Sequence, residues 1–175
     1  MRYVAFLKAI NVGGHVVKMD ALRRMFESIG FARVETFIAS GNVVFDAGAA
    51  KAAALEREIE AHLHKALGYA VPAFLRSMSE LAGIANHTPF DGSEAAARVY
   101  IAFLQRKPAA EASAKLLAFR NEIDDLHVHK REVYWLCRST FSESTFSGPL
   151  LEKTLKMQAT IRNTTTVRKL AAKYC

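Results

Sequence analysis

Two short glycine-bearing stretches hold the residues best suited to bind an anion. The first, KAINVGG (8–14), places a lysine, an asparagine and two glycines directly after an apolar run. The second is the tight-turn sequence SGN (40–42), which separates two further apolar runs. Backbone N–H groups in such turns can form a concave anion-binding site, and glycine permits the left-handed conformations involved. The candidate ligand-binding residues here are Lys8, Asn11, Gly13, Gly14, Ser40, Gly41 and Asn42.

A simpler interpretation is that these glycines only allow the chain to turn. Neither stretch has the spacing GxGxxG or GxxxxGKS/T of established phosphate-binding loops. The spacing alone leaves both interpretations open.

A third candidate region is TIRNTTTVRKL (160–170), near the C-terminus. Asn163 or one of the threonines after it is expected to cap a last helix, and Arg162 precedes that cap. A guanidinium beside a helix N-terminus suits a phosphate or a carboxylate, so Arg162 and Asn163 join the candidate site. The alternative is a structural arginine that attaches the last helix to the rest of the protein.

Two His-x-His pairs are candidate metal ligands. His62 and His64 fall on a predicted helix, where side chains two residues apart point in different directions. His127 and His129 fall on a predicted strand, where they share a face and could ligate zinc. No third ligand with suitable spacing is visible in the sequence, so no metal site is predicted. The sequence also shows no cofactor motif, and it does not identify catalytic residues.

The elements that position these residues follow from hydrophobic periodicity. Within residues 1–76, Asp20 is an expected helix N-cap, Gly30 and Gly68 end helices, and Pro72 marks an edge strand. Helices separate the first strand from the second and the third from the fourth, and the strands are predicted over 2–10, 33–39, 41–46 and 71–76. The resulting β-α-β-β-α-β order is the ferredoxin-like split βαβ pattern.

In this pattern the first two strands run parallel, and the third lies antiparallel between them. The end of the first strand and the start of the third therefore share one edge of the sheet. INVGG (10–14) and SGN (40–42) are expected to be neighbours there, with Lys8 close by.

The fold class is therefore predicted to be α+β. A ferredoxin-like subdomain is expected over 1–77, followed by a connecting helix and loop over 78–97. A smaller second α+β subdomain is predicted over 98–175, with a strand, a helix over 110–123, a β-hairpin and two further helices, the last of them basic. The residues themselves show no internal repeat.

The composition is that of a globular protein, with 51% hydrophobic and 23% charged residues. No apolar run reaches the roughly 20 residues that a membrane span needs, and Lys8 interrupts the N-terminal run too early for a signal peptide. Cys137 and Cys175 have no partner at a metal-type spacing and are expected to be free thiols, which favours a cytoplasmic protein.

The positive charge is concentrated in the second half of the chain. Residues 98–175 carry 14 Lys and Arg against 7 Asp and Glu, so the whole formal charge of +7 arises there. Such a surface prefers anionic partners. The alternative is a solvated basic face without a partner.

Three motifs together resemble a known family. LKAINVGG (7–14), TFIASGNVVF (36–45) and ATIRNTTTV (159–167) are similar, in this order, to LRGINVGG, TYIQSGNVVF and TxRNWNTV of the bacterial domain-of-unknown-function family 1697. The resemblance implies a ferredoxin-like N-terminal subdomain with a second α+β subdomain, and it implies no activity. It marks, without a role, Asn11, Gly13, Gly14, Ser40, Gly41, Asn42, Thr160, Arg162, Asn163 and Val167.

This chain departs from the family pattern in places. Lys8 stands where the family usually has Arg, Ala9 where it has Gly, and Thr164 where it has Trp. Lysine lacks the bidentate fork of arginine, and the absence of the Trp removes a large stacking surface.

The function expected from the sequence is binding of an anion or a nucleotide in a cleft between the two subdomains. A phosphorylated small molecule is the expected partner, with INVGG and SGN on one wall and Arg162 on the other. One alternative is a nucleic-acid-binding module, although the aromatic residues of the predicted sheet do not form the RNP1 pattern; these are Tyr3, Phe6, Phe37 and Phe45. Another is a structural or partner-binding protein without a small ligand. The sequence leaves open whether the protein is an enzyme and how it oligomerises.

Overall fold

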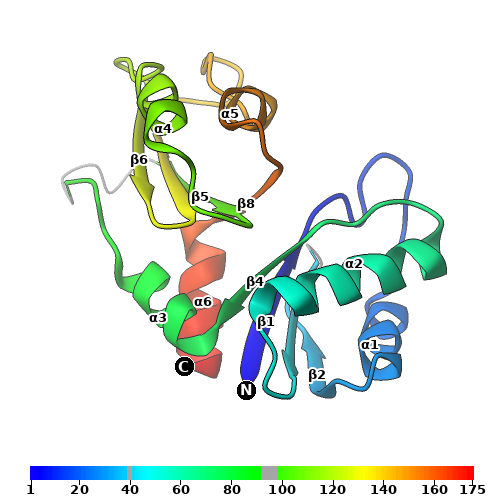
Figure 1. The fold of residues 1–175 in the computed structure, drawn as a ribbon. Helices are drawn as coiled ribbons and strands as arrows, with labels where there is room; N and C mark the ends of the chain where they lie inside the picture. The colour runs from blue at the N-terminus through cyan, green and yellow to red at the C-terminus, as the bar shows by residue number, and fades with distance from the viewer. Residues whose placement is uncertain (39–40, 92–97) are drawn as a thin grey trace. The chain divides into compact units, whose positions relative to one another are not determined.

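The computed structural model describes residues 1–38, 41–91 and 98–175, and the chain divides into two compact units (Figure 1). Unit 1 comprises residues 1–83 and 170–175, and unit 2 comprises residues 84–169. The chain first forms β1 (Arg2–Leu7), α1 (Met19–Ser28), β2 (Ala32–Thr36), β3 (Asn42–Asp46), α2 (Ala52–Leu67), β4 (Ala73–Ser77) and α3 (Met78–Asn86). It continues with β5 (Arg98–Leu104), α4 (Ala110–Leu117), β6 (Asp124–His129), β7 (Glu132–Cys137), α5 (Gly148–Leu155), β8 (Ala159–Asn163) and α6 (Thr164–Tyr174).

Unit 1 is built on an antiparallel sheet with the strand order β2-β3-β1-β4. Alternation along the strands directs residues such as Phe45 toward α1 and α2, whose apolar stripes include Leu22, Phe26 and Ile59. All four of these side chains are fully buried. The β-α-β-β-α-β order and the edge position of β4, just after Pro72, agree with the sequence prediction.

Several local predictions for unit 1 were wrong. The strand predicted over 2–10 ends at Leu7. Asp20 does not cap α1, because Lys18 occupies the N-cap position without a side-chain cap hydrogen bond. Asp20 lies in the first turn of the helix, where its carboxylate still interacts favourably with the helix dipole. The strand predicted over 33–39 is also shorter, since β2 ends at Thr36 and Ile38 takes a left-handed conformation (φ 55°).

Unit 2 repeats the element order and the strand order of unit 1. Its antiparallel sheet has the order β6-β7-β5-β8, and α4 and α5 pack on one face. Strand β8 was not predicted, because the segment ATIRN mixes polar and apolar residues directly before the last helix. With β8 included, this sheet matches that of unit 1 strand for strand.

Helix α4 is shorter than predicted, ending at Leu117 rather than continuing to residue 123. The side-chain oxygen of Asn121 accepts hydrogen bonds from the backbone N–H groups of Ile123 (2.7 Å) and Asp124 (2.9 Å). Such local side-chain hydrogen bonds compete with helix formation and here start the approach to β6.

The two halves also share a short sequence once the structure aligns them. The shared pattern is Ala, any residue, Leu or Ile, Arg, and then Ser or Asn. It occurs as AFLRS in β4 (Ala73–Ser77) and as ATIRN in β8 (Ala159–Asn163), and a helix directly follows each strand. Arg76 and Arg162 are therefore equivalent, with 0% and 8% of their surface exposed. In each, Nη1 donates to the carbonyl oxygen of the preceding residue, at 2.7 Å and 2.9 Å.

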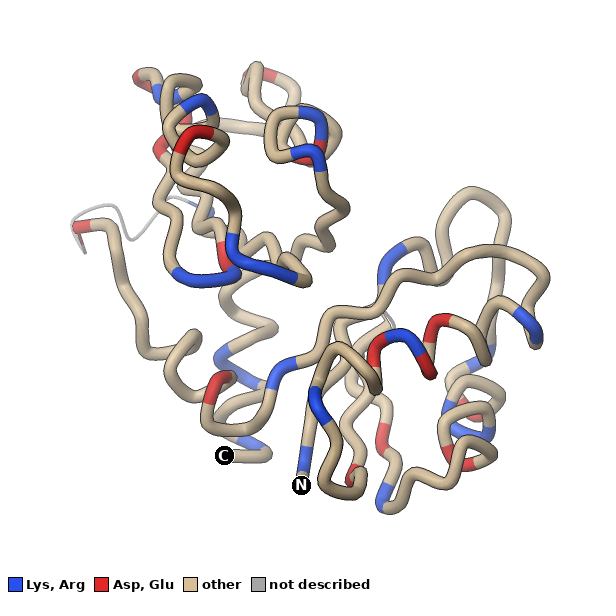
Figure 2. The backbone as a smooth tube through the Cα atoms, in the orientation of Figure 1, with Lys and Arg blue, Asp and Glu red and all other residues tan. Residues whose placement is uncertain are grey.

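The basic residues of unit 2 are distributed over several helices and turns (Figure 2). Two basic segments, 106–107 and 130–131, lie near each other, because Leu104 N–H donates to Arg131 O (2.9 Å) and Arg131 Nη1 donates to Gln105 O (3.4 Å). Within the described residues, no helix is both long enough and apolar enough to cross a membrane.

Candidate functional site

The loop after β1 and the turn before β3 lie side by side, as the sequence predicts. The Leu7 N–H donates to Gly41 O (2.8 Å), and the Lys8 N–H donates to Pro72 O (2.9 Å). A Cβ atom on Gly41 would lie 2.5 Å from Ile10 Cγ2, closer than such atoms approach in proteins. Because Gly41 also has a φ of 75°, both the packing and the backbone conformation require glycine here.

Asn42 has a structural role in the same turn. Only 1% of its surface is exposed, and its Nδ2 donates to Phe37 O (3.0 Å) while its own carbonyl oxygen accepts from Phe37 N–H (2.9 Å). Ser40 lies outside the described residues. The described part of the SGN turn therefore packs and reverses the chain.

The loop between β1 and α1 keeps an exposed backbone with several left-handed residues. Ala9, Asn11, Gly13 and Gly14 have φ values of 61°, 57°, 63° and 85°. The Asn11 side chain closes the loop by accepting a hydrogen bond from Val17 N–H (2.6 Å). Among the described residues, no heavy atom lies within 4 Å of a Cβ built on either glycine, so their surroundings there are open. Repeated left-handed residues orient N–H groups as in anion-binding nests.

Arg162 is a buried residue of β8. Its Nη1 donates to Thr160 Oγ1 (2.8 Å) and to Ile161 O (2.9 Å). Burial lowers the pKa of its guanidinium to about 10, so the group remains cationic at neutral pH. These contacts favour the structural interpretation of Arg162, and its contact with an anion stays a prediction.

Asn163 caps the last helix, as predicted, because its Oδ1 accepts a hydrogen bond from Thr165 N–H (2.7 Å). The same residue lines a pocket within unit 2. Of the predicted ligand-binding residues, Asn163 is thus one that lines a pocket. The predicted cleft between the subdomains stays a prediction.

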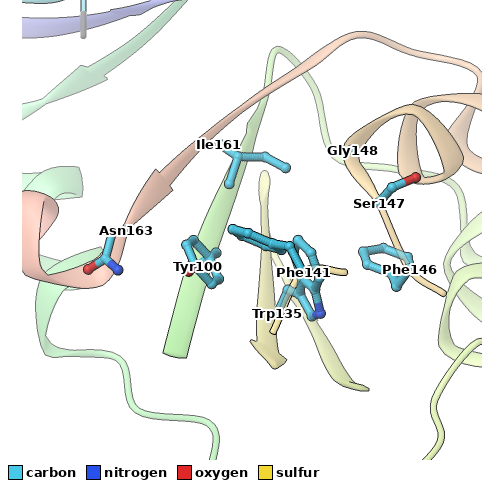
Figure 3. Close-up of a pocket in the computed structure, with 8 residues that line it drawn as sticks. All are labelled: Tyr100, Trp135, Phe141, Phe146, Ser147, Gly148, Ile161 and Asn163. Carbon is cyan, nitrogen blue, oxygen red and sulfur yellow. The ribbon is translucent and has the colours of Figure 1, made fainter. Parts of the chain in front are cut away.

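This pocket has a volume of about 440 Å³ and is lined mainly by aromatic side chains (Figure 3). Small-molecule sites typically measure about 300–1,000 Å³. The ring of Phe141 lies 4.8 Å from that of Tyr100 and 5.2 Å from that of Trp135, measured between centroids. Phe141 is 52% exposed, so an apolar ring stands at the solvent side of an aromatic wall. The other lining residues are Phe146, Ser147, Gly148, Ile161 and Asn163.

A buried carboxylate holds the pocket wall in place. Asp124 is fully buried, and its Oδ1 accepts hydrogen bonds from Trp135 Nε1 (2.7 Å) and from Ser144 Oγ (2.8 Å). The Ser144 hydroxyl oxygen accepts in turn from Phe146 N–H (3.1 Å). One carboxylate therefore fixes both the indole and the loop that carries the two phenylalanines.

Two helix starts flank the aromatic rings. Ser147 caps α5, its Oγ accepting from Leu150 N–H (3.3 Å), and Gly148 begins that helix. Asn163 lies on the opposite side of the pocket, at the start of α6 (Figure 3). The N-terminal ends of helices carry partial positive charge, so an anionic group is favoured near them.

The aromatic residues of the pocket were not predicted as a site. They come from β5, β7 and the loop before α5, and the fold alone brings them together. The available signal was in STFSESTFSG (139–148), where two phenylalanines stand among small polar residues. Large apolar residues in such a loop need either a buried environment or a ligand.

Unit 2 also brings three histidines together. The ligand nitrogens of His87, His127 and His129 all lie within 4.8 Å of one another. Burial, followed by repulsion from the neighbouring histidine charges, lowers the pKa of both His87 and His127, which favours their neutral form. A metal site was not predicted because no third ligand was visible, and in the folded chain His87 lies at that position.

Comparisons with known proteins agree with this architecture. The family described as "Protein of unknown function (DUF1697)" matches residues 1–134, which include the first two of the three sequence motifs. No curated protein matches the chain. The conserved bacterial protein SP0830 from Streptococcus pneumoniae has a similar fold, with a TM-score of 0.80 and 24% sequence identity over 98% of this chain and 97% of the other. The chain therefore belongs to DUF1697, a family of proteins of unknown function.

Proposed function

We propose that the protein binds a small molecule of the nucleotide class, with a planar ring and an anionic group, in the aromatic pocket of unit 2. The observation that carries this proposal is the convergence of Tyr100, Trp135, Phe141 and Phe146 on one open pocket. Stacking of a base on an aromatic side chain contributes about 1–3 kcal/mol and suits any planar ring.

The polar groups of the pocket support an anionic or carbonyl group beside the ring. The Oδ1 of Asn163 is engaged by the helix cap, so its amide nitrogen is the atom that can donate to a ligand. In Figure 3 this nitrogen lies on the side of Tyr100. The start of α5 at Gly148 adds favourable partial charge across the pocket.

The proposal includes a cytoplasmic location. Both cysteines are free, Cys137 buried and Cys175 exposed, as suits a reducing compartment. Nucleic-acid binding and a purely partner-binding role remain the alternatives.

Isothermal titration calorimetry with nucleoside monophosphates, the corresponding nucleosides and inorganic phosphate tests the proposal. We expect the nucleotides to bind, the nucleosides to bind more weakly, and phosphate not to compete. Phe141→Ala should weaken nucleotide binding by about 10-fold, the equivalent of about 1.4 kcal/mol of lost stacking. Phe119→Ala is the control for the loss of an exposed ring (38%), because Phe119 does not line the pocket, although its ring centroid lies 6.4 Å from that of Phe146. Equal nucleotide affinity of Phe141→Ala and the parent, or no affinity for nucleotides or nucleosides, would refute the proposal.

A second candidate function is anion binding by the loop between β1 and α1 in unit 1. The left-handed residues of this loop, with exposed Gly13 and Gly14, support it. Pyrophosphate binding should be lost on replacing both glycines by alanine, because alanine is strained at positive φ. Gly48→Ala is the matched control, since Gly48 is exposed and does not have a positive φ, and a Cβ built on it meets no atom of the described part of the chain within 4 Å. Pyrophosphate binding that survives the double substitution would exclude this function.

A further inference from the structure

The histidine cluster of unit 2, defined as His87, His127 and His129, has the composition and geometry of a metal site. We propose that it binds one divalent ion of a late first-row transition metal, with Zn²⁺ as the expected ion. The proposal is separate from ligand binding in the aromatic pocket.

Two of the three ligands are placed by a single strand. His127 and His129 are two residues apart on β6, so their side chains leave the same face of the sheet. They stand opposite Tyr134 and Glu132 of β7 in the strand register. This places both imidazoles over one small area of the sheet.

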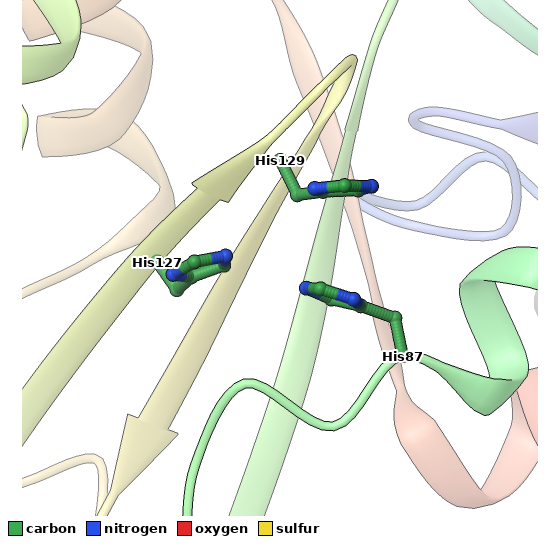
Figure 4. Close-up of side chains that lie close together, drawn as sticks. All are labelled: His87, His127 and His129. Atoms are coloured by element: carbon green, nitrogen blue, oxygen red, sulfur yellow. The ribbon is translucent and has the colours of Figure 1, made fainter.

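The third ligand comes from the segment that follows α3. His87 lies directly after this helix, and its ring centroid is 5.3 Å from that of His127 and 4.2 Å from that of His129. Figure 4 shows the imidazole of His87 stacked against that of His129, with the imidazole of His127 beside them. Tyr134 Oη donates to Ile84 O (3.2 Å), which anchors the end of α3 just before His87.

One nitrogen of the cluster needs a partner. His87 Nε2 is buried and has no hydrogen-bond partner among the described residues. Buried polar atoms in native proteins are almost always paired, so this atom points to a ligand of some kind. A metal ion held jointly with His127 and His129 supplies that partner.

The distances are compatible with coordination after a small closure. In a tetrahedral Zn²⁺ site with Zn–N bonds of about 2.0–2.1 Å, the nitrogens are about 3.3 Å apart. The ligand nitrogens here all lie within 4.8 Å of one another, and the rings of His87 and His129 are stacked at an interplanar angle of 20°. Side-chain rotations that unstack these two rings and bring the nitrogens about 1–2 Å closer therefore complete the site. Three imidazoles leave a fourth position for water or a substrate atom.

The ligand set also indicates the class of metal. Imidazole nitrogens suit Zn²⁺, Cu²⁺, Ni²⁺ and Co²⁺, whereas Mg²⁺ and Ca²⁺ prefer oxygen ligands. The cluster is composed of histidines alone, so Mg²⁺ and Ca²⁺ are not expected to compete.

The cluster and the aromatic pocket lie on opposite faces of the same sheet. In the register of β6 and β7, Leu126 stands opposite Trp135 and His127 stands opposite Tyr134. Trp135, which lines the pocket, and His127 are therefore one position out of phase. Because successive side chains of a strand point to opposite faces, the two sites are independent. The failure of one proposal therefore does not decide the other.

The test is a titration of the untagged, chelator-treated protein with Zn²⁺, using a chromophoric chelator as competitor. We expect one equivalent of Zn²⁺ to bind, and Co²⁺ to give the intense visible bands of low-coordinate cobalt. His87→Ala and His127→Ala should each weaken Zn²⁺ binding by about 100-fold or more. The double variant His62→Ala/His64→Ala is the matched control, because it removes a His-x-His pair on α2 and should leave binding unchanged.

A histidine variant could bind less Zn²⁺ only because it is less stable. Melting curves recorded with and without Zn²⁺ separate this effect from the loss of a metal ligand. Zn²⁺ should raise the melting temperature of the parent and of the His62/His64 variant, but not that of His127→Ala. The proposal is wrong if the parent fails to bind one equivalent, or if His87→Ala and His127→Ala bind Zn²⁺ as tightly as the parent. Loss of binding in the His62/His64 variant would also contradict it, by placing the site on α2.

Discussion

Gly41 holds the loop after β1 in place, and Asp124 holds the wall of the aromatic pocket. Each does so through contacts that depend on its residue type. Gly41 lets the turn before β3 approach the loop after β1. Asp124 accepts hydrogen bonds from both the pocket indole and the pocket loop. At this scale the structure explains why these positions should tolerate little change.

Gly41→Ala should destabilise unit 1 by about 2–4 kcal/mol, because the left-handed backbone and the contact with Ile10 each add strain. Urea unfolding followed by far-UV circular dichroism measures this. Gly48→Ala, at an open position, should change stability by less than about 0.5 kcal/mol. Similar unfolding midpoints for both variants would show that the close approach is unimportant.

Asp124→Ala should destabilise unit 2 by about 2–4 kcal/mol, since the Trp135 and Ser144 donors lose their buried partner. Trp135 is the only tryptophan, so its fluorescence reports on this unit directly. Asp124→Asn retains one acceptor oxygen and should lose less stability. An unchanged emission spectrum and unfolding midpoint in Asp124→Ala would refute this role.

At the scale of elements, an ion-pair group ties the end of α6 to β2 within unit 1. Glu35 Oε1 accepts from Arg2 Nη2 (2.7 Å), and its Oε2 accepts from Tyr174 Oη (3.0 Å) and Lys173 Nζ (3.3 Å). Burial raises the pKa of Glu35, but the hydrogen bonds and charges of Tyr174, Lys173 and Arg2 together lower it. The folded carboxyl group therefore releases its proton at a lower pH than the unfolded one.

This stabilisation should be present above the unfolded pKa of Glu35, near 4.5, and should disappear as the pH falls through the lower folded value. Because Glu35 is well exposed, the expected loss in Glu35→Gln is only about 0.5 kcal/mol at pH 7. Urea unfolding at pH 7 and pH 3 measures it, with Glu58→Gln on α2 as the control. A stability difference between Glu35→Gln and the parent that is as large at pH 3 as at pH 7 would contradict this account.

Periodicity and end signals predicted most elements, because they depend on local physics. Gly30 and Gly68 end α1 and α2, both with positive φ, and Ser147 with Pro149 starts α5. Strand β8 was missed because its five residues mix polar and apolar types directly before the last helix and include a buried arginine. Elements whose burial depends on distant partners are the ones that periodicity cannot reveal.

At the scale of the whole molecule, the chain uses one strand order twice. The equivalent arginines Arg76 and Arg162 occupy the fourth position of the edge strands β4 and β8. The repeat escaped sequence analysis because few residues are shared beyond this segment. Both candidate sites escaped it for a related reason, since tertiary contacts assemble the aromatic pocket and the histidine cluster from separate elements.

Arg76→Lys and Arg162→Lys should each lower stability by about 1–3 kcal/mol, because lysine lacks the planar fork that bonds to the strand carbonyl. Circular dichroism reports on both variants and Trp135 fluorescence on the second. Arg168→Lys, at an exposed position of α6, is the control. A loss confined to one of the two equivalent positions would argue against equivalent roles.

The most direct test of the proposed function observes the indole N–H of Trp135 by ¹H–¹⁵N NMR, where the single tryptophan gives one resolved signal. The indole is held by Asp124 at the pocket wall, so a ligand stacked there must change its surroundings. We predict that a nucleoside monophosphate shifts this signal in the parent and shifts it much less in Phe141→Ala. A nucleotide that binds by calorimetry yet leaves the indole signal in place would contradict the aromatic pocket as the binding site.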